Sequence, residues 1–281
     1  MLLLWKRDIG LGGKMFLEDC KVLENRQISG SYYLMKLKGE KVIESSCAGQ
    51  FFMLQCKNEA TLLRRPISLH YINRKENVIE FYYEVKGKGT KEFSCLSEGD
   101  IINIQGPLGH GFTTQVEKKT IVVVGGGMGI APMKLLIESL SEKNNVIFIC
   151  GGRNAESIKI LENMNLKNIE TIITTDDGSV GIKGNVTVPL RKILAERKID
   201  GVYTCGPHIM MEFVAKAAEE FGVYCEVSLE ERMACGVKAC VGCSILTNEG
   251  MKKVCHDGPV FDSRVVIDVN PKETVPCSCG K

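Results

Sequence analysis

The sequence lacks any apolar run that approaches the ~20 residues needed to span a bilayer. Residues 1–4 are apolar, but this run is too short for the core of a signal peptide, and its basic residues follow the run instead of preceding it. The 36 basic and 34 acidic residues leave a net charge of +2, so no excess of positive charge is available for nucleic acid or an anionic membrane. We therefore expect a cytoplasmic protein without nucleic-acid or membrane partners.

The sequence also lacks the pattern of a disulfide framework, although it contains 13 cysteines. A chain of 281 residues buries enough hydrophobic core to fold without covalent cross-links, and the cysteine count is odd. Most cysteines, such as Cys20, Cys56 and Cys150, stand singly in apolar runs, where a thiol packs as a small hydrophobic group. Cys277 and Cys279, close to the C-terminus, are expected to be reactive thiols and not a second metal site.

Hydrophobic patterning divides the chain into three domains, with extensions at residues 1–14 and 271–281. Residues 15–116 contain short alternating or apolar runs and no sustained helical period. Short strands at this spacing predict a small β-barrel. The strand-like runs are 32–38, 49–56, 67–72, 78–85 and 100–105.

Residues 117–223 alternate apolar strand-like runs with amphipathic helical patterns, which predicts an α/β domain with a parallel sheet covered by helices. Pro132 opens the first helical pattern, as proline in a first helical turn does. Further helical patterns cover 155–164, 188–197 and 208–221. Residues 224–270 are rich in cysteine and glycine and contain no long helical pattern. We expect a bound group, more than a hydrophobic core, to organise this small C-terminal domain.

Four cysteines in the last domain have the spacing of an iron–sulfur site. Four residues separate Cys235 from Cys240, two separate Cys240 from Cys243, and eleven separate Cys243 from Cys255. This is the plant-type spacing that holds a 2Fe–2S cluster, in which each iron takes two thiolates. Zinc ligands usually come as two C-x2-C pairs, and Cys255 has no partner at that spacing. The pattern therefore favours a cluster over zinc or four merely buried thiols.

A strand, a glycine-rich turn and a helix start follow one another at residues 122–132. Such a turn lets backbone N–H groups and the helix dipole meet a diphosphate. The run is not the G-x-G-x-x-G fingerprint, because Ile130 stands where the third glycine would fall. A Cys-Gly-Pro sequence that ends a later strand adds weight, since ligands of open parallel sheets bind at the carboxyl ends of strands. The candidate nucleotide residues are Gly125, Gly126, Gly127, Gly129, Ile130, Ala131, Pro132, Cys205, Gly206 and Pro207.

Two further patterns lie in the β domain, Arg65-Pro66-Ile67-Ser68 and Gly87-Lys88-Gly89-Thr90. An arginine and a loop of N–H groups suit a diphosphate, and a serine hydroxyl can hydrogen-bond the edge of a flavin. The order Arg-Pro-x-Ser, Gly-x-Gly-Thr, glycine-rich loop and Cys-Gly-Pro is similar to that of the ferredoxin–NADP reductase superfamily. With the segments 229–236 and 255–261 around the cysteines, residues from about 15 to 268 closely resemble the electron-transfer subunits of NAD-dependent (type B) dihydroorotate dehydrogenase.

This resemblance implies a cofactor for each domain. The β domain would be a Greek-key barrel that binds FAD, the α/β domain would bind NAD, and the four cysteines would hold the 2Fe–2S cluster. The implied FAD contacts are Arg65, Pro66, Ile67, Ser68, Tyr82, Tyr83, Glu84, Gly89 and Thr90. Two positions depart from the family pattern, since Glu84 replaces a frequent arginine and Lys238 a usual glycine.

The implied partner is a separate catalytic subunit that contains FMN and oxidises dihydroorotate to orotate in pyrimidine (UMP) biosynthesis. The resemblance also implies a heterotetramer of two plus two subunits. No catalytic acid, base or nucleophile is expected in this chain, although the Cys205 thiol is small enough to lie against a nicotinamide ring. A sulfhydrogenase γ subunit or a ferredoxin:NADP oxidoreductase subunit stays an alternative, as does a non-enzymatic metal scaffold. Arg153 leaves the choice between NAD and NADP open.

Overall fold

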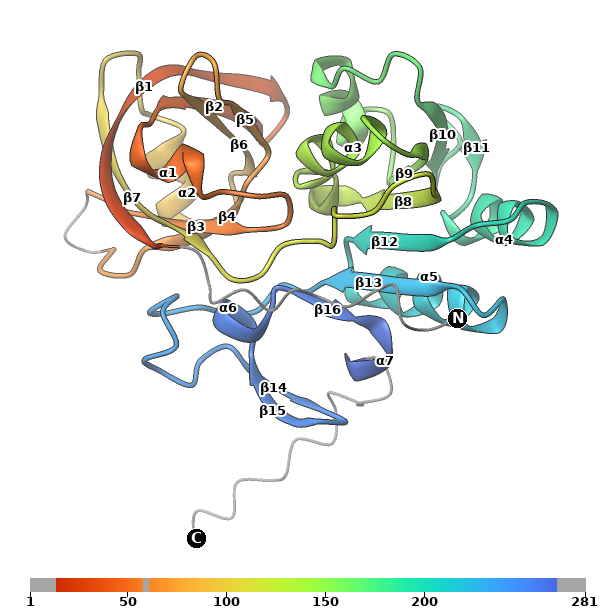
Figure 1. Ribbon diagram of the computed structural model, residues 1–281. Coiled ribbons are helices and arrows are strands. Elements are labelled where there is room, and N and C mark those ends of the chain that lie inside the picture. Colours follow the sequence, from red (N-terminus) through yellow and green to blue (C-terminus); the bar gives the residue numbers. More distant parts are fainter. Residues whose placement is uncertain (1–13, 58–60, 267–281) are drawn as a thin grey trace, which may run out of the picture.

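The computed structural model describes residues 14–57 and 61–266 and shows two seven-stranded sheets and a two-stranded hairpin. In Figure 1 the first sheet curls into a barrel beside the second sheet, and the C-terminal segment lies below both. The predicted extensions, apart from Lys14, and the cysteines 277 and 279 lie outside the described residues. No helix in the described ranges is both long and apolar enough to cross a membrane.

The first sheet is antiparallel and has the strand order β4-β3-β7-β1-β2-β6-β5. Two short helices, α1 and α2, lie between its strands. The elements are β1 (Phe16–Ser29), β2 (Tyr32–Lys38), α1 (Lys41–Glu44), β3 (Phe51–Leu54), β4 (Arg65–Ser68), β5 (Tyr71–Asn73), β6 (Val78–Glu84), α2 (Lys88–Phe93) and β7 (Ile101–Leu108).

The predicted strand at 67–72 is in fact two strands with a corner between them. The N–H of Leu69 donates to Gln50 beside β3, while the N–H of His70 donates to Glu80 in β6, both at 3.0 Å. One stretch of chain therefore pairs with β3 on one side of the corner and with β6 on the other. This corner brings the two edges of the sheet together and closes the barrel, which a pattern of apolar residues could not indicate.

The second sheet has the order β11-β10-β9-β8-β12-β13-β16 and is parallel except for β16. The chain order reverses between β8 and β12, which is where ligands bind in open α/β sheets. The elements are β8 (Thr120–Gly126), η1 (Gly127–Ile130), α3 (Met133–Ser141), β9 (Asn145–Gly152), η2 (Glu156–Asn163), β10 (Glu170–Thr175), β11 (Ile182–Lys183), α4 (Thr187–Glu196), β12 (Gly201–Cys205), α5 (His208–Glu220), β13 (Tyr224–Ser228) and β16 (Val260–Asp262).

The helical pattern predicted at 155–164 forms the 3₁₀ helix η2 and not an α-helix. At its start the Ser157 hydroxyl donates to the Asn154 carbonyl at 2.7 Å, and the Asn154 side chain accepts the N–H of Ser157 at 3.0 Å. Such local side-chain bonds compete with the α-helical pattern. The other predicted helices correspond to α3, α4 and α5.

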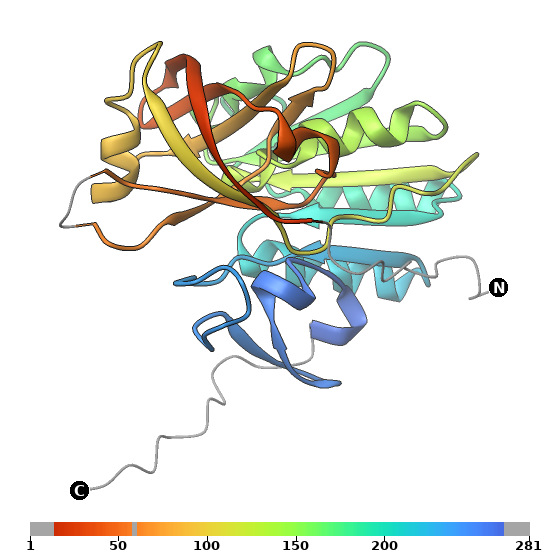
Figure 2. The same ribbon diagram turned by 60° about the vertical axis from the view of Figure 1, so that its left-hand side comes forward.

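The C-terminal segment contains the hairpin β14 (Ser244–Thr247) and β15 (Gly250–Lys253) and the short helices α6 (Val254–Asp257) and α7 (Ser263–Val266). Figure 2 shows this segment beneath the barrel and the second sheet. β13 and β16 belong to the second sheet although they follow residue 223. The predicted boundary between 223 and 224 stays a proposal, since it separates these two strands from the rest of their sheet.

Candidate cofactor sites

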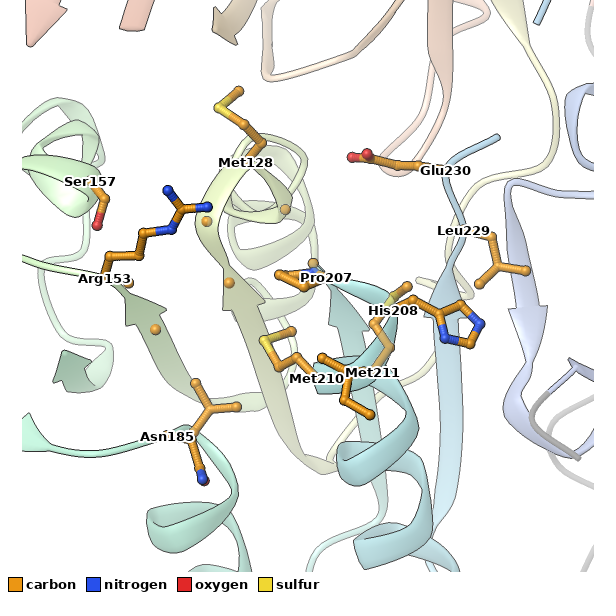
Figure 3. A pocket seen from close by; sticks show the side chains of 18 of the residues that line it. Met128, Arg153, Ser157, Asn185, Pro207, His208, Met210, Met211, Leu229 and Glu230 are labelled. Carbon is orange, nitrogen blue, oxygen red and sulfur yellow. The ribbon is translucent and has the colours of Figure 1, made fainter. Parts of the chain in front are cut away.

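A cavity of about 1150 Å³ lies where the barrel meets the carboxyl ends of the parallel strands. The barrel contributes Tyr32 and Glu84, and the second sheet contributes the loops that follow β8, β9 and β12. Figure 3 shows Arg153 and Glu230 extending into the cavity from opposite sides, with the side chains of α5 below them. The cavity therefore occupies the position at which an α/β sheet binds its ligand.

The two predicted nucleotide loops are in direct contact at this edge. A Cβ atom on Gly129 would overlap the carbonyl of Cys205, and one on Gly126 would overlap the Met210 sulfur. Gly127 has a φ of +53°, a conformation that glycine adopts without strain. Among the residues predicted to bind the nucleotide, those that line the cavity are Gly126, Gly127, Gly129, Gly206 and Pro207. Buried residues of the same loops are Gly125, Ile130, Ala131, Pro132 and Cys205.

The thiol of Cys205 is buried at the end of β12, with 2% of the residue exposed. Burial raises the pKa of Cys205 well above its usual range, and the Ser228 hydroxyl lies within hydrogen-bonding distance. The group is therefore a neutral thiol at neutral pH. A neutral thiol is not a nucleophile, which agrees with the expectation that Cys205 has no nucleophilic role.

Several lining residues were not predicted from the sequence. Met128, Met210 and Met211 give the cavity a flexible apolar wall. Glu230 is open to solvent in the cavity, yet the surrounding protein desolvates its carboxyl and raises its pKa. Met210 and Met211 lie in the first turn of α5, close after Cys-Gly-Pro. This position in the sequence could have identified them as lining residues.

The candidate flavin residues lie on neighbouring parts of the barrel. The side chain of Arg65 covers Gly89, because a Cβ atom there would lie 2.6 Å from the Arg65 Nε. The Thr90 hydroxyl accepts the N–H of Lys86 at 3.0 Å and so shapes the loop that precedes α2. The structure thus brings one predicted pattern, Arg65–Ser68 in β4, onto the other, the Gly-x-Gly-Thr loop.

Tyr82 and Tyr83 point to opposite faces of β6, as neighbours in a strand do. The Tyr83 hydroxyl donates to Asn25 at 3.0 Å and its ring packs on Phe93 inside the barrel. The Tyr82 hydroxyl is buried on the outer face and has no hydrogen-bond partner among the described residues. A buried hydroxyl without a partner is costly, so this atom fits a bound polar group such as a flavin. The adjacent Glu84 lines the cavity and pairs with Lys86 at 3.0 Å.

The four cluster cysteines lie together in the loop before β14 and in α6. Backbone N–H groups point at their sulfurs, from Val237 and Cys240 to Cys235, from Lys238 to Cys255, and from Cys255 to Cys243, at 3.3–3.5 Å. Donation of N–H groups to sulfur is the environment that tunes a protein-bound iron–sulfur cluster. The N–H of Gly242 also contributes to lowering the pKa of Cys240 to about 7, which favours the thiolate that binds metal.

The sulfurs are arranged as two pairs. Cys240 lies within hydrogen-bonding distance of Cys235, and Cys255 within that of Cys243. Two pairs fit two irons with two thiolates each, whereas zinc requires four ligands around a single ion. The donor set therefore fits a 2Fe–2S cluster.

Comparison with known proteins agrees with this geometry. Residues 230–267 match the family described as the iron–sulfur cluster binding domain of dihydroorotate dehydrogenase B, and residues 123–216 match the oxidoreductase NAD-binding domain. The chain is similar to the electron transfer subunit of dihydroorotate dehydrogenase B (NAD(+)) from Desulforamulus reducens, with 37% identity over 89% of this chain and 97% of the relative. The same subunit from Listeria monocytogenes is 40% identical over 88% and 97%.

A solved structure of an NADH-dependent reduced ferredoxin-NADP oxidoreductase is also similar, with a TM-score of 0.80 and 30% identity over 88% of this chain and 89% of that one. That structure shares its fold with nearly all the described residues of this chain. The relatives named above match along almost their full length at more than 30% identity. The chain therefore belongs to the family of electron transfer subunits of dihydroorotate dehydrogenase B.

Proposed function

We propose that the cavity binds the nicotinamide nucleotide, that the adjoining outer face of the barrel binds FAD, and that Cys235, Cys240, Cys243 and Cys255 hold the 2Fe–2S cluster. The chain is an oxidoreductase subunit that uses NAD, FAD and a 2Fe–2S cluster. Its function is electron transfer for dihydroorotate dehydrogenase B in pyrimidine biosynthesis.

The observation that carries the site proposal is the contact between the cluster loop and β3, the strand that pairs with the flavin strand β4. Gly236 lies against Met53 of β3, since a Cβ atom on this glycine would be 2.7 Å from the Met53 Cγ. Met53 pairs with Pro66 in β4, the strand of the candidate flavin residues. One strand therefore separates the cluster loop from the candidate flavin site, which suits transfer of single electrons between them.

A bound flavin supplies the step between the two-electron chemistry of nicotinamide and the one-electron chemistry of a cluster. The chain's own residues position the groups. The contact of Gly129 with Cys205 fixes the two nucleotide loops, and the methionines give the cavity an apolar wall. Cys205 remains a neutral thiol. Orientation of this kind contributes to the rate without a catalytic acid or base.

The catalytic partner is proposed to be an FMN-containing dihydroorotate dehydrogenase subunit, in a heterotetramer of two plus two. Exposed apolar side chains within the cluster loop favour a protein contact there. Val241 is 74% exposed and Val237 38%. Two more exposed apolar side chains, Leu62 (90%) and Leu63 (51%), precede β4, the strand of the candidate flavin residues. A partner seated on the cluster loop would lie over the cysteines, and dihydroorotate oxidation would belong to that partner.

The test is an anaerobic purification followed by a visible spectrum and metal analysis. We expect flavin bands and a broad iron–sulfur absorption, both bleached by NADH. Cys240→Ser should remove the iron–sulfur absorption and keep the flavin bands, while Cys95→Ser, at an exposed thiol outside the cluster loop, should keep both. A colourless protein that contains zinc would refute the proposal.

A second candidate function rests on the similarity to the NADH-dependent reduced ferredoxin-NADP oxidoreductase. Such a chain would use the same sites and serve a different partner. Copurification of the tagged chain from its native cells separates the two. An FMN protein that together with this chain reduces NAD with dihydroorotate supports the first candidate, and a partner whose complex lacks this activity supports the second.

A further inference from the structure

The peptide groups of Lys238 connect two parts of the cluster-binding segment. Its N–H points at the Cys255 sulfur at 3.4 Å, and its carbonyl accepts a hydrogen bond from the Lys253 ammonium at 2.9 Å. Lys238 has a φ of +65°, in the left-handed region that residues with a side chain rarely adopt. A residue held there needs a contact that maintains the conformation, and the Lys253 ammonium supplies one.

Lys253 is itself held in place. It ends β15, and its backbone N–H donates to the Asp257 carboxylate at 2.6 Å. The next residues form α6, which carries Cys255. The Asp257 carboxylate is also bonded by the His256 ring at 3.0 Å. The Lys253 ammonium therefore sits at a defined position beside the cluster loop, directed at the Lys238 carbonyl.

We propose that Lys253 is a positioning residue for the iron–sulfur cluster: by holding the Lys238 carbonyl, its ammonium maintains the left-handed backbone conformation of Lys238 in which the N–H faces the Cys255 sulfur. This inference rests on the proposed function of the four cysteines. Hydrogen bonds to the sulfurs and a fixed positive charge both favour the cluster with one more electron. Lys253 therefore raises the reduction potential of the cluster and so shifts electrons from the flavin toward it.

The test is the midpoint potential of the cluster in the intact holoprotein, measured by an anaerobic redox titration that is followed by electron paramagnetic resonance. In Lys253→Met we expect the ratio of reduced to oxidised cluster at a fixed potential to fall about tenfold. For a one-electron couple this corresponds to a midpoint potential that is lower by ~59 mV. Lys253→Arg keeps the cation and the donor and should stay near the parent value. Lys252→Met is the matched control, because Lys252 is the neighbouring residue of β15 and pairs with Glu249.

A second pair of variants separates position from charge. Glycine adopts the left-handed conformation freely. In Lys238→Gly the N–H should therefore face Cys255 without the hydrogen bond from Lys253 to the carbonyl of residue 238. In that background Lys253→Met should shift the potential less than it does in the parent protein. An equal shift in both backgrounds would mean that Lys253 acts by charge alone and would overturn the positioning role.

Equal shifts in Lys253→Met and Lys252→Met would also overturn the proposal, because the effect on the midpoint potential would then not be specific to Lys253. If Lys253→Met does not yield folded protein, Lys253→Gln decides, since it keeps a neutral donor near the Lys238 carbonyl. In Lys253→Gln, a fall of the reduced-to-oxidised ratio by less than tenfold supports the positioning role, because the donor is kept and only the charge is lost; a fall of tenfold or more, or no fall at all, overturns it. Absence of iron–sulfur absorption from the parent protein would refute the proposed function instead.

Discussion

A buried ion pair joins the barrel to the nucleotide domain, and its removal should destabilise the protein strongly. The Lys134 ammonium lies 2.9 Å from the Glu80 carboxylate, and both side chains are only 11% exposed. The ammonium also lies 4.1 Å from the centre of the Tyr71 ring. Lys134 is in the first turn of α3, directly after the glycine-rich loop, whereas Glu80 is in β6. The pair thus fixes the nucleotide loop relative to the barrel.

In Lys134→Met the Glu80 carboxylate remains buried without its counterion, which costs about 3–5 kcal/mol in comparable cases. Urea unfolding of the holoprotein at neutral pH should show a loss in this range. Glu80→Gln in the same background removes the unpaired charge and should recover a large part of it. Bleaching of the flavin by NADH should also slow in Lys134→Met, because the nucleotide loop is then less firmly positioned.

Lys143→Met is the control for the loss of a lysine as such. Its ammonium pairs with Glu117 on the surface, where the two side chains are 62% and 59% exposed, and exposed pairs contribute little to stability. We expect no measurable change. A loss in Lys134→Met no larger than that of the control would refute the reasoning, as would a double variant no more stable than Lys134→Met alone.

Three further predictions concern single sites. Gly129→Ala should abolish bleaching by NADH and leave the flavin and cluster absorption intact, since its methyl group would overlap the Cys205 carbonyl. Burial lowers the pKa of His70 to about 3. Below pH ~6.5 the unfolded chain therefore binds one proton more than the folded protein, and the free energy of unfolding should fall by up to ~1.4 kcal/mol per pH unit as the pH drops toward 3. His70→Asn should make this pH dependence less steep in acid titrations. Asp176 and Arg153 line the same cavity. A carboxylate there would repel the 2′-phosphate of NADPH, so Asp176→Ala should raise kcat/KM for NADPH relative to NADH about tenfold, whereas an unchanged ratio would assign the preference elsewhere.

Much of the architecture follows from local sequence patterns. The run expected at 32–38 is the strand Tyr32–Lys38, because alternation of buried and exposed residues is a property of one strand. The cysteine spacing indicated a site whose sulfurs the structure places in two pairs. The similarity of Cys-Gly-Pro and the glycine-rich loop to known motifs indicated two loops that prove to be in contact.

Other features depend on contacts between distant parts of the chain. Tyr82 and Tyr83 are both buried, so hydrophobicity could not indicate which of them faces the barrel interior. The corner at Leu69 and His70 depends on two distant carbonyl groups, that of Gln50 beside β3 and that of Glu80 in β6, which accept their N–H groups. β13 and β16 join the second sheet by pairing, although composition groups them with the cysteine-rich segment.

The glycines of the motifs stand where two segments of the chain come into contact. Gly89 is covered by Arg65 within the candidate flavin site, and Gly129 by the end of β12 within the candidate nucleotide site. Gly236 of the cluster loop is covered by Met53 of β3, the strand that pairs with β4 of the candidate flavin site. A methyl group would therefore disturb a single site at Gly89 or Gly129, whereas at Gly236 it would push the cluster loop away from the barrel. Substitution of Gly236 should therefore change the coupling between flavin and cluster before it changes the stability of either part.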